Sequence, residues 1–265
     1  KASIPLSEEP LKPKRDFTSL KPEETVKEFL AAELSASEFL MESCMQIAEA
    51  ASIMADSLKK GGRLIYLGAG TSGRLAALDC VELPCTFGLP PEKAIALIAG
   101  GNADAAIEIE FQKEEDASSI PELILLNLTE ADTVIGISAS GSAYYVRSGL
   151  AFAKLKKANT VLLSESANSF TDSSDCDLLI EMHSGLELIA GSTRLKAGTA
   201  TKKILNALSS TAMVMLGKTA GPYMIDMQCL NEKLKRRAIS IIKRLHGTGE
   251  GEATMLLEEN AYNLR

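Results

Sequence analysis

The 265-residue chain has no tryptophan, two histidines and only 5% aromatic residues. The two histidines, His183 and His246, stand alone in the sequence and form no pair with zinc-ligand spacing. The five cysteines are odd in number, scattered and without a Cys-x-x-Cys motif, which favours reduced structural thiols over a disulfide framework. The sequence therefore argues against a zinc centre and predicts a site without a metal.

Long apolar runs and an excess of positive charge are also missing. No run approaches the about 18 apolar residues of a membrane-spanning helix, so we expect no membrane partner. Lysine and arginine number 28 against 35 aspartates and glutamates, for a formal charge of −7. This balance argues against nucleic acid as a partner, because phosphate binding needs a basic face. The first residues lack the apolar core of a signal peptide, and we expect a cytoplasmic protein.

The chain does contain a short apolar run, residues 63–68, that stops at glycines and two hydroxyl side chains before a helical pattern begins. This pattern predicts a strand, a tight turn and a helix start. Glycines let the backbone approach a ligand, and the first free N–H groups of a helix attract anions. Gly70, Thr71 and Ser72 are therefore candidates for binding a phosphate or a sugar phosphate. The alternative is that Thr71 and Ser72 only cap the helix. The glycine spacing matches neither of the standard nucleotide-binding loops.

A second turn repeats this pattern. After the strand expected at residues 133–138 come hydroxyl and glycine residues, and then a helix expected at 143–157. The candidate ligand-binding residues of this turn are Ser138, Ser140, Gly141 and Ser142. Strands that alternate with helices predict a parallel sheet, so both turns would lie at its carboxyl edge, where open α/β sheets bind ligands. The two turns together favour an anionic small molecule.

The remaining patterns predict a doubly wound α/β fold with a parallel five-stranded sheet. Strands are expected at residues 63–68, 94–99, 133–138, 160–163 and 177–181. Helices are expected at 22–60 with a break near 35–37, from about residue 75, at 103–116, at 143–157 and from about 231 onward. A loop rich in proline and glycine is expected at 79–91.

The segment Gly191–Ala200 opens a long helix that is expected to end near residue 217. We expect Ser192 or Thr193 to cap this helix. Arg194 and Lys196 are candidates for supplying positive charge to a phosphate or a carboxylate. The alternative is that both cations lie in solvent.

Four ordered motifs resemble the N-acetylmuramic acid 6-phosphate etherases, which belong to the sugar isomerase (SIS) family of phosphosugar-binding domains. The motifs are Gly68-Ala-Gly-Thr-Ser-Gly-Arg74, Glu82-Leu-Pro-Cys-Thr-Phe-Gly88, Ile98-Ala-Gly-Gly101 and Gly191-Ser-Thr-Arg-Leu-Lys-Ala-Gly-Thr-Ala200. The related glucokinase regulatory proteins share them. The resemblance runs from about residue 60 to the last residue. We therefore expect an N-terminal arm with helices (1–60), a SIS domain (61–225) and a small C-terminal helical region (226–265).

The resemblance implies an elimination reaction. The etherases open the sugar ring, a base takes the C2 proton beside the aldehyde, and an acid helps expel D-lactate from C3. Water then adds to give N-acetylglucosamine 6-phosphate. Two carboxyl groups suffice, so no metal or redox cofactor is expected. Glu82 matches the acid of the family. We expect it close to the phosphate-binding turn, among the apolar residues Val81, Leu83 and Phe87, which would favour a protonated carboxyl group.

The base lies where this sequence departs from the family pattern. The etherases carry Val-Glu-Gly-Ala-Glu-Asp in a stretch where this chain has Ile109–Asp116. Glu110 matches the first glutamate and Lys113 stands where the catalytic glutamate belongs. Glu114 lies one position later, which turns a helical side chain by about 100°. Our candidate base is Glu114, with Lys113 or Glu110 as alternatives. A second departure is Ser142–Tyr145, where the etherases usually have Arg-Thr-Pro-Tyr.

Two functions from different classes follow from the resemblance. The first is a cytoplasmic carbon–oxygen lyase that acts on a phosphorylated amino sugar. The second is a non-catalytic sugar-phosphate sensor that signals through a partner, as the glucokinase regulatory proteins do. Those regulators carry two SIS units and this chain carries one, which disfavours a close copy of the second. Since the family is dimeric, a homodimer is expected.

Overall fold

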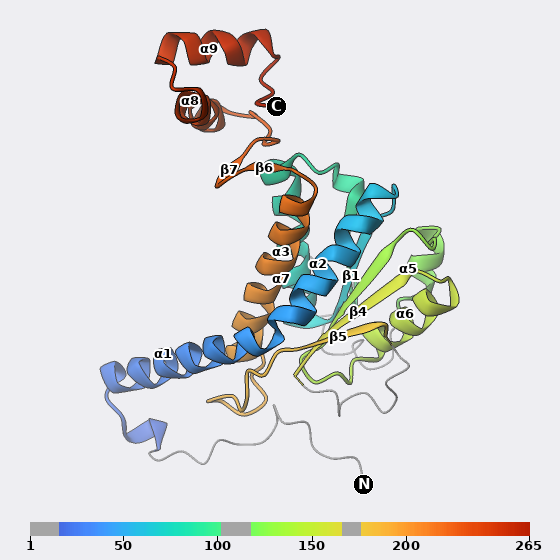
Figure 1. The fold of residues 1–265 in the computed structure, drawn as a ribbon. Helices are drawn as coiled ribbons and strands as arrows, with labels where there is room; N and C mark the ends of the chain where they lie inside the picture. The colour runs from blue at the N-terminus through green and yellow to red at the C-terminus, as the bar shows by residue number, and fades with distance from the viewer. Residues whose placement is uncertain (1–15, 102–117, 166–175) are drawn as a thin grey trace.

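The computed structural model describes residues 16–101, 118–165 and 176–265, which form an α/β fold around a parallel five-stranded sheet (Figure 1). The strands are β1 (Leu64–Gly68), β2 (Ala94–Ile98), β3 (Thr133–Ile137), β4 (Asn159–Ser164) and β5 (Leu178–Glu181). Their spatial order is β2-β1-β3-β4-β5, and all neighbouring pairs are parallel. The expected fold class is confirmed, and each strand lies close to its expected range.

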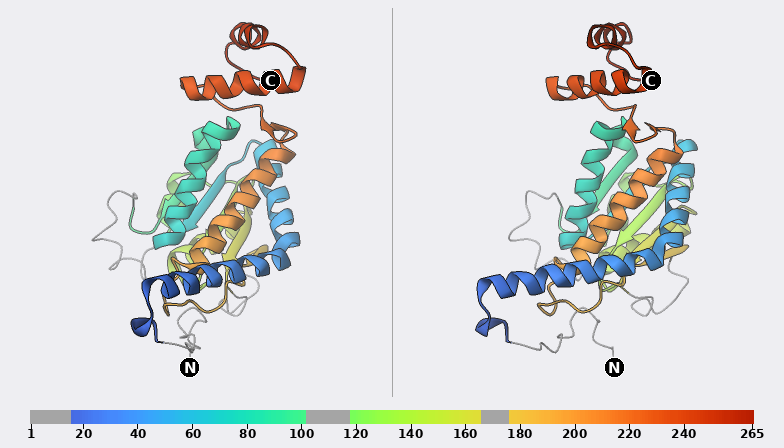
Figure 2. Two further views of the ribbon diagram at one scale, coloured as in Figure 1. Left: turned by 90° about the vertical axis from the view of Figure 1, so that its left-hand side faces the viewer. Right: turned by 60° about the vertical axis from the view of Figure 1, so that its left-hand side comes forward.

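Helices cover both faces of the sheet (Figures 1 and 2). They are α2 (Cys44–Lys59), α3 (Gly70–Phe87) and α7 (Lys196–Met215) on one face, and α5 (Ile120–Leu125) and α6 (Tyr144–Leu155) on the other. Alternate residues of a strand point to opposite faces. Leu64 and Tyr66 of β1 accordingly pack in the first layer, and Ile65 and Leu67 in the second. Burial on both sides explains the continuous apolar runs of these strands.

The carboxyl ends of β1 and β3 form the point where the winding of the sheet reverses. From β1 the chain returns through α3 to β2, and from β3 it returns through α6 to β4 in the opposite direction across the sheet. Helices α3 and α6 therefore lie on opposite faces. Gly68 of β1 is in register with Ile137 of β3, so the turns that follow both strands begin at the same level. Open α/β sheets bind ligands in the crevice at such a reversal.

The N-terminal helices break later than the sequence predicted. A short 3-10 helix, η2 (Phe17–Ser19), precedes α1 (Pro22–Phe39), which runs through the expected break near 35–37. The break falls instead at the 3-10 helix η3 (Leu40–Ser43). The Ser37 hydroxyl donates to the Glu33 carbonyl at 2.9 Å, so the helix accommodates this serine by bonding it to the preceding turn.

Helix α3 is longer than expected. The loop predicted from residue 79 is helical to Phe87, although Pro84 lies inside the helix. Proline removes only one hydrogen bond of a helix, and α3 ends at Gly88, whose φ is +61° and whose N–H donates to the Pro84 carbonyl at 3.0 Å. The 3-10 helix η4 (Pro91–Lys93) then leads into β2. Helix α5 was not predicted, and the acidic helix expected at 103–116 lies outside the described residues.

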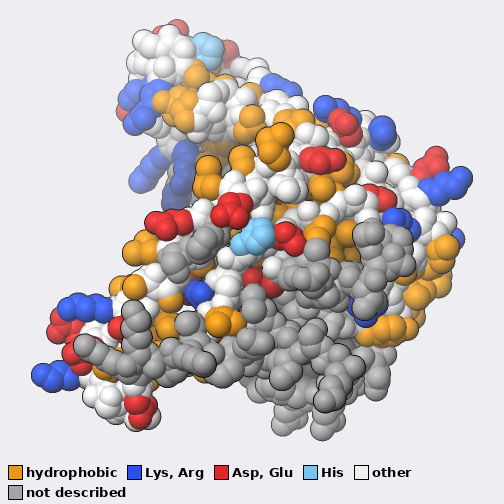
Figure 3. Space-filling view, turned by 60° about the horizontal axis from the view of Figure 1, so that its bottom comes forward, with side chains coloured by type: hydrophobic (Ala, Val, Ile, Leu, Met, Phe, Trp, Pro, Cys, Tyr) orange, Lys and Arg blue, Asp and Glu red, His pale blue; other side chains and the backbone are white. Residues whose placement is uncertain are grey.

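The C-terminal residues form a small helical lobe. The hairpin of β6 (Thr219–Ala220) and β7 (Tyr223–Met224) leads to α8 (Glu232–His246) and α9 (Glu250–Glu259). These two helices share a core of four buried side chains: Ala238, Ile242, Ala253 and Leu257. The lobe lies at the opposite end of the molecule from α1 (Figure 1), and basic side chains gather on it (Figure 3). Within the three described ranges, no helix is long and apolar enough to cross a membrane.

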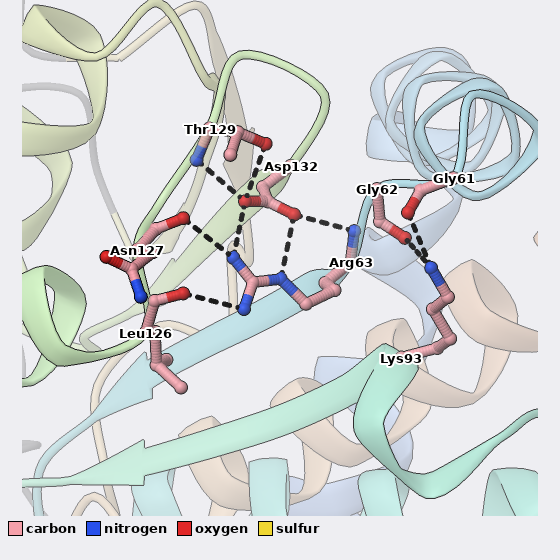
Figure 4. A network of polar contacts seen from close by, with 8 residues as sticks. All are labelled: Gly61, Gly62, Arg63, Lys93, Leu126, Asn127, Thr129 and Asp132. Carbon is pink, nitrogen blue, oxygen red and sulfur yellow. Dashed lines mark hydrogen bonds and ion pairs between the residues drawn. The ribbon is translucent and has the colours of Figure 1, made fainter.

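A buried ion pair connects the beginnings of β1 and β3 (Figure 4). The Arg63 guanidinium donates to both Asp132 carboxylate oxygens, at 3.0 and 2.8 Å, and also to the carbonyls of Leu126 and Asn127. The Thr129 N–H donates to the same carboxylate at 2.8 Å. The Asp132 side chain is 1% exposed. Removing this carboxylate would leave several polar groups without their acceptor.

We therefore expect Asp132→Asn to lower the free energy of unfolding by about 3 kcal/mol, as when one partner of a buried ion pair is removed. Urea unfolding at neutral pH measures the change. Asp56→Asn is the matched control, because Asp56 pairs with Lys59 at 3.3 Å on the exposed surface of α2, and such pairs contribute less than about 1 kcal/mol. Equal losses for the two variants would contradict a stabilising role specific to Asp132.

The same ion pair predicts a dependence on pH. Burial raises the pKa of Asp132, but hydrogen bonds from Arg63 and Thr129 outweigh it, and the pKa is lowered overall. A carboxyl group whose pKa is lower in the folded state stabilises the fold above about pH 4, and loses this effect as the pH falls through the folded-state pKa. The stability difference between wild type and Asp132→Asn should therefore shrink in acid. A difference that grows in acid would contradict this sign.

Candidate functional site

The turn after β1 presents the N-terminus of α3 at the carboxyl edge of the sheet. Ala69 is the N-cap residue of this helix, and its methyl side chain cannot accept a hydrogen bond. Thr71 and Ser72 lie half-buried inside the first helical turn, so the alternative that they cap α3 is wrong. The first N–H groups of a helix have no partner within the helix, and they carry the positive end of its dipole. This turn therefore suits an anion, and both hydroxyls lie beside it.

Two glycines make this turn tight. A Cβ atom added to Gly68 would lie 2.5 Å from the Gly73 nitrogen and 2.7 Å from its Cα atom. A Cβ atom added to Gly73 would lie 2.7 Å from Cγ2 of Ile98 and 2.8 Å from the Gly68 carbonyl oxygen. The start of α3 thus rests directly on the end of β1, with no room for a side chain between them.

The turn after β3 is built in a similar way. The Gly141 N–H donates to the Ser138 carbonyl at 3.1 Å, and the φ of Gly141 is +71°. The Ser140 and Ser142 hydroxyl oxygens lie 2.7 Å apart in a hydrogen bond. Ala143, the N-cap residue of α6, again offers no side-chain acceptor. A second helix N-terminus therefore points to the same edge of the sheet, with three serines beside it.

The N-terminus of α7 differs from these two. The helix begins at Lys196 rather than near Ser192, so the expected caps Ser192 and Thr193 are wrong. The buried Glu187 carboxylate takes their place, accepting from the N–H groups of Lys196 and Ala197 at 3.0 Å each. The Glu187 carboxylate already accepts the hydrogen bonds of the first N–H groups of α7. A ligand anion at this helix end would therefore be repelled by a like charge.

The two cations expected near the ligand lie in different surroundings. Arg194 is exposed, whereas Lys196 is buried and its Nζ donates to the Ser184 carbonyl at 2.7 Å. The start of α7 nevertheless lies against the start of α3, because a Cβ atom added to Gly198 would be 3.6 Å from Cγ2 of Thr71. Lys196 thus lies near the turn after β1 but is bonded to the protein backbone.

Comparison with known proteins agrees with this geometry. Residues 46–154, which include both turns, match the family described as the glucokinase regulatory protein N-terminal SIS domain. An N-acetylmuramic acid 6-phosphate etherase of Caldanaerobacter subterraneus subsp. tengcongensis is 43% identical over 219 residues, 83% of this chain and 71% of that protein. The etherase of Salmonella agona is 38% identical over 250 residues, 94% of this chain and 84% of that protein. This chain belongs to the N-acetylmuramic acid 6-phosphate etherase family.

This chain shares its fold with solved structures of phosphosugar isomerases. A phosphoheptose isomerase from Francisella tularensis superimposes with a TM-score of 0.54 at 17% identity, covering 75% of this chain and 100% of that chain. At this identity the likeness concerns the fold alone. The SIS-type architecture expected from the sequence is therefore confirmed by a distant structure as well as by close relatives.

Glu82, the acid that the etherase resemblance implies, lies far from the turn after β1 of its own chain. Glu82 is inside α3, twelve residues after Gly70, which at 1.5 Å per residue separates them by about 18 Å. Its side chain is exposed, and the neighbouring Val81 is 64% exposed. The expected apolar surroundings and the expected closeness to the turn after β1 are both wrong for a single chain, because the sequence did not reveal the full length of α3. The candidate bases Glu114, Lys113 and Glu110 lie outside the described residues.

Sequence reasoning missed a polar cluster beside the second turn of this etherase family member. Glu165 directly follows β4 and is 7% exposed. Its carboxylate accepts from the Ser184 N–H at 2.9 Å and from the Ser184 hydroxyl, and its own N–H donates to the Ala139 carbonyl at 3.1 Å. Burial raises the pKa of Glu165; the hydrogen bonds from Ser184 oppose this, but the pKa is raised overall. The available signal was its position: an acidic residue just after a strand that ends at the ligand-binding edge.

Proposed function

We propose that this protein is an N-acetylmuramic acid 6-phosphate etherase, which eliminates D-lactate to give N-acetylglucosamine 6-phosphate. The observation that carries the proposal is the pair of turns at the reversal of the sheet, in a chain that belongs to this family. Each turn supplies a helix N-terminus without a side-chain cap, and together they offer the hydroxyls of Thr71, Ser72, Ser140 and Ser142. Ser138, the fifth candidate, directly follows β3 and is buried. Such a site suits the phosphate of a sugar phosphate.

The proposed chemistry needs one base and one acid. The base removes the C2 proton of the open-chain sugar, and the C3–O bond to the lactyl group breaks as the acid protonates the departing oxygen. Water then adds across the C2=C3 bond, returning hydrogen to C2 and placing a hydroxyl on C3. We assign the base to Glu114, with Lys113 and Glu110 as alternatives, and the acid to Glu82. No step of this sequence transfers electrons to an acceptor, so it calls for no redox cofactor.

We further propose that the protein works as a homodimer in which each site receives Glu82 from the partner copy. The about 18 Å between Glu82 and the start of its own α3 is too far for both to contact one hexose phosphate. The same face of α3 exposes apolar side chains, Leu78 at 42% and Val81 at 64%, next to the exposed Cys85. A second copy that covered this face would bury these side chains and bring Glu82 to a site. Because a phosphorylated sugar does not cross a lipid bilayer unaided, we assign the enzyme to the cytoplasm.

The test is to incubate the purified protein with N-acetylmuramic acid 6-phosphate and to assay D-lactate and N-acetylglucosamine 6-phosphate. Equal amounts of the two products, formed without added metal or nicotinamide, are expected. Lys113 at the position of the family's base favours one other function, a sugar-phosphate sensor. No lactate from a protein that still binds N-acetylglucosamine 6-phosphate would overturn the etherase proposal in favour of the sensor.

A further inference from the structure

Glu165 lies at the carboxyl edge of the sheet and connects the turn after β3 to the segment after β5. Its N–H holds the Ala139 carbonyl inside the serine-rich turn, at 3.1 Å. Its carboxylate accepts hydrogen bonds from the N–H and the hydroxyl of Ser184, in the segment after β5. The side chain is buried beside the turn and lies between two segments whose positions it ties together.

Ser184 continues this connection toward the turn after β1. Its carbonyl accepts the hydrogen bond of the buried Lys196 ammonium at 2.7 Å. Lys196 is the first residue of α7, and two residues later Gly198 lies close to Thr71, since a Cβ atom added to it would be 3.6 Å from Cγ2 of Thr71. A continuous set of hydrogen bonds and contacts therefore runs from Ala139, through Glu165 and Ser184, to the turn that begins α3.

The hydrogen bonds along this path indicate what a carboxyl group contributes at position 165. Both of its oxygens accept from Ser184, whereas a glutamine amide keeps one acceptor oxygen for the N–H and turns its NH2 group toward the Ser184 hydroxyl, which must rotate to accept. The Lys196 ammonium donates to the carbonyl of the same serine, so the position of Ser184 also fixes the position of Lys196. Glutamine, which has the same shape, would thus change the hydrogen bond to the Ser184 hydroxyl and remove the carboxyl group without creating a cavity.

We propose that Glu165 is a positioning residue of the sugar-phosphate site, a role that rests on the proposed function. It fixes the turn after β3 relative to the turn after β1, so that both sets of hydroxyls meet one ligand. It does not contact the substrate itself. Because a positioning residue acts on the bound ligand throughout the reaction, its loss weakens binding more than it slows the bond-breaking steps.

The test is Glu165→Gln. We expect KM for lactate release and Kd for N-acetylglucosamine 6-phosphate to rise about tenfold, with kcat changed by less than about threefold. Ser184→Ala removes one of the two donors and should shift Kd in the same direction by a smaller factor. Asp132→Asn is the matched control, since its buried carboxylate lies at the other edge of the sheet and should change stability without changing Kd.

The outcomes separate this inference from the proposed function. An unchanged Kd in Glu165→Gln, with or without lower stability, would overturn the positioning role. An equal rise in Kd for Asp132→Asn would also overturn it, because the effect would then be a general consequence of lost stability. Wild type that binds N-acetylglucosamine 6-phosphate but releases no lactate would overturn only the etherase activity, and the Kd comparison would stand. Wild type that binds no sugar phosphate would overturn both, and if Glu165→Gln does not fold, Ser184→Ala decides.

Discussion

Replacing Glu82 with glutamine is expected to lower kcat for lactate release about a thousandfold, within the range that general acid catalysis contributes. The lactyl oxygen would then leave as an alkoxide without a proton donor. Because Glu82 is exposed in the single chain, the free energy of unfolding should change by less than about 0.5 kcal/mol. Binding of N-acetylglucosamine 6-phosphate should be little affected. Glu92→Gln, at an exposed glutamate shortly after α3, is the matched control and should keep full activity.

Mixing two inactive variants tests whether Glu82 acts across the dimer. Ser72→Leu would block the turn after β1 and leave Glu82 intact, whereas Glu82→Gln leaves the turn intact. A mixed dimer would then contain one complete site, made of the turn of one copy and Glu82 of the other. After random exchange of equal amounts, about a quarter of wild-type activity should return, since half of the dimers are mixed and each has one working site. If the subunits are shown to have exchanged and no activity returns, the site is not shared between copies. Glu82 would then have no catalytic role, because it lies too far from the turn of its own chain.

The sequence sufficed to predict the sheet and the turns that organise the site. The buried strands β1, β3 and β4 are short apolar runs ended by glycine or serine, and such local patterns are sufficient to place parallel strands. The strand order and the register that pairs Gly68 with Ile137 were not predicted. Parallel strands joined by helices share one carboxyl edge, and this placed both turns at the same edge of the sheet. These features depend on residues close together in the chain.

What the sequence did not reveal depends on contacts between distant residues. Helix α3 continues past Pro84 because Gly88, not the proline, supplies the left-handed residue that ends it, and this extension moves Glu82 away from the turn. The cap of α7 comes from Glu187, nine residues before the helix begins, so no local capping pattern could identify it. Glu165 and Ser184 are 19 residues apart and meet only after β4 and β5 have paired.

The second large effect is expected for Gly68→Ala. All three nearest neighbours of the new Cβ atom would be backbone atoms of Ser72 and Gly73, at 2.5 to 2.8 Å, so the first turn of α3 must move away from β1. A displacement of this kind shifts the N–H groups and hydroxyls that we assign to the phosphate, and misplacement by about 1 Å costs on the order of a hundredfold. We expect Kd for N-acetylglucosamine 6-phosphate to rise at least about a hundredfold, together with a loss of about 2 kcal/mol in unfolding free energy.

Two further glycines separate the loss of binding from the loss of stability in Gly68→Ala. Gly251→Ala adds a methyl group to α9 where no atom lies within 4 Å, and it should leave Kd unchanged and stability equal or slightly higher. Gly73→Ala meets first the end of the Ile98 side chain, at 2.7 Å, and then the Gly68 carbonyl oxygen at 2.8 Å, so part of its clash can be relieved. Isothermal titration with N-acetylglucosamine 6-phosphate should therefore give the weakest affinity for Gly68→Ala and an intermediate affinity for Gly73→Ala. The affinity of Gly251→Ala should equal that of wild type. A folded Gly68→Ala protein with wild-type affinity would mean that the phosphate binds elsewhere.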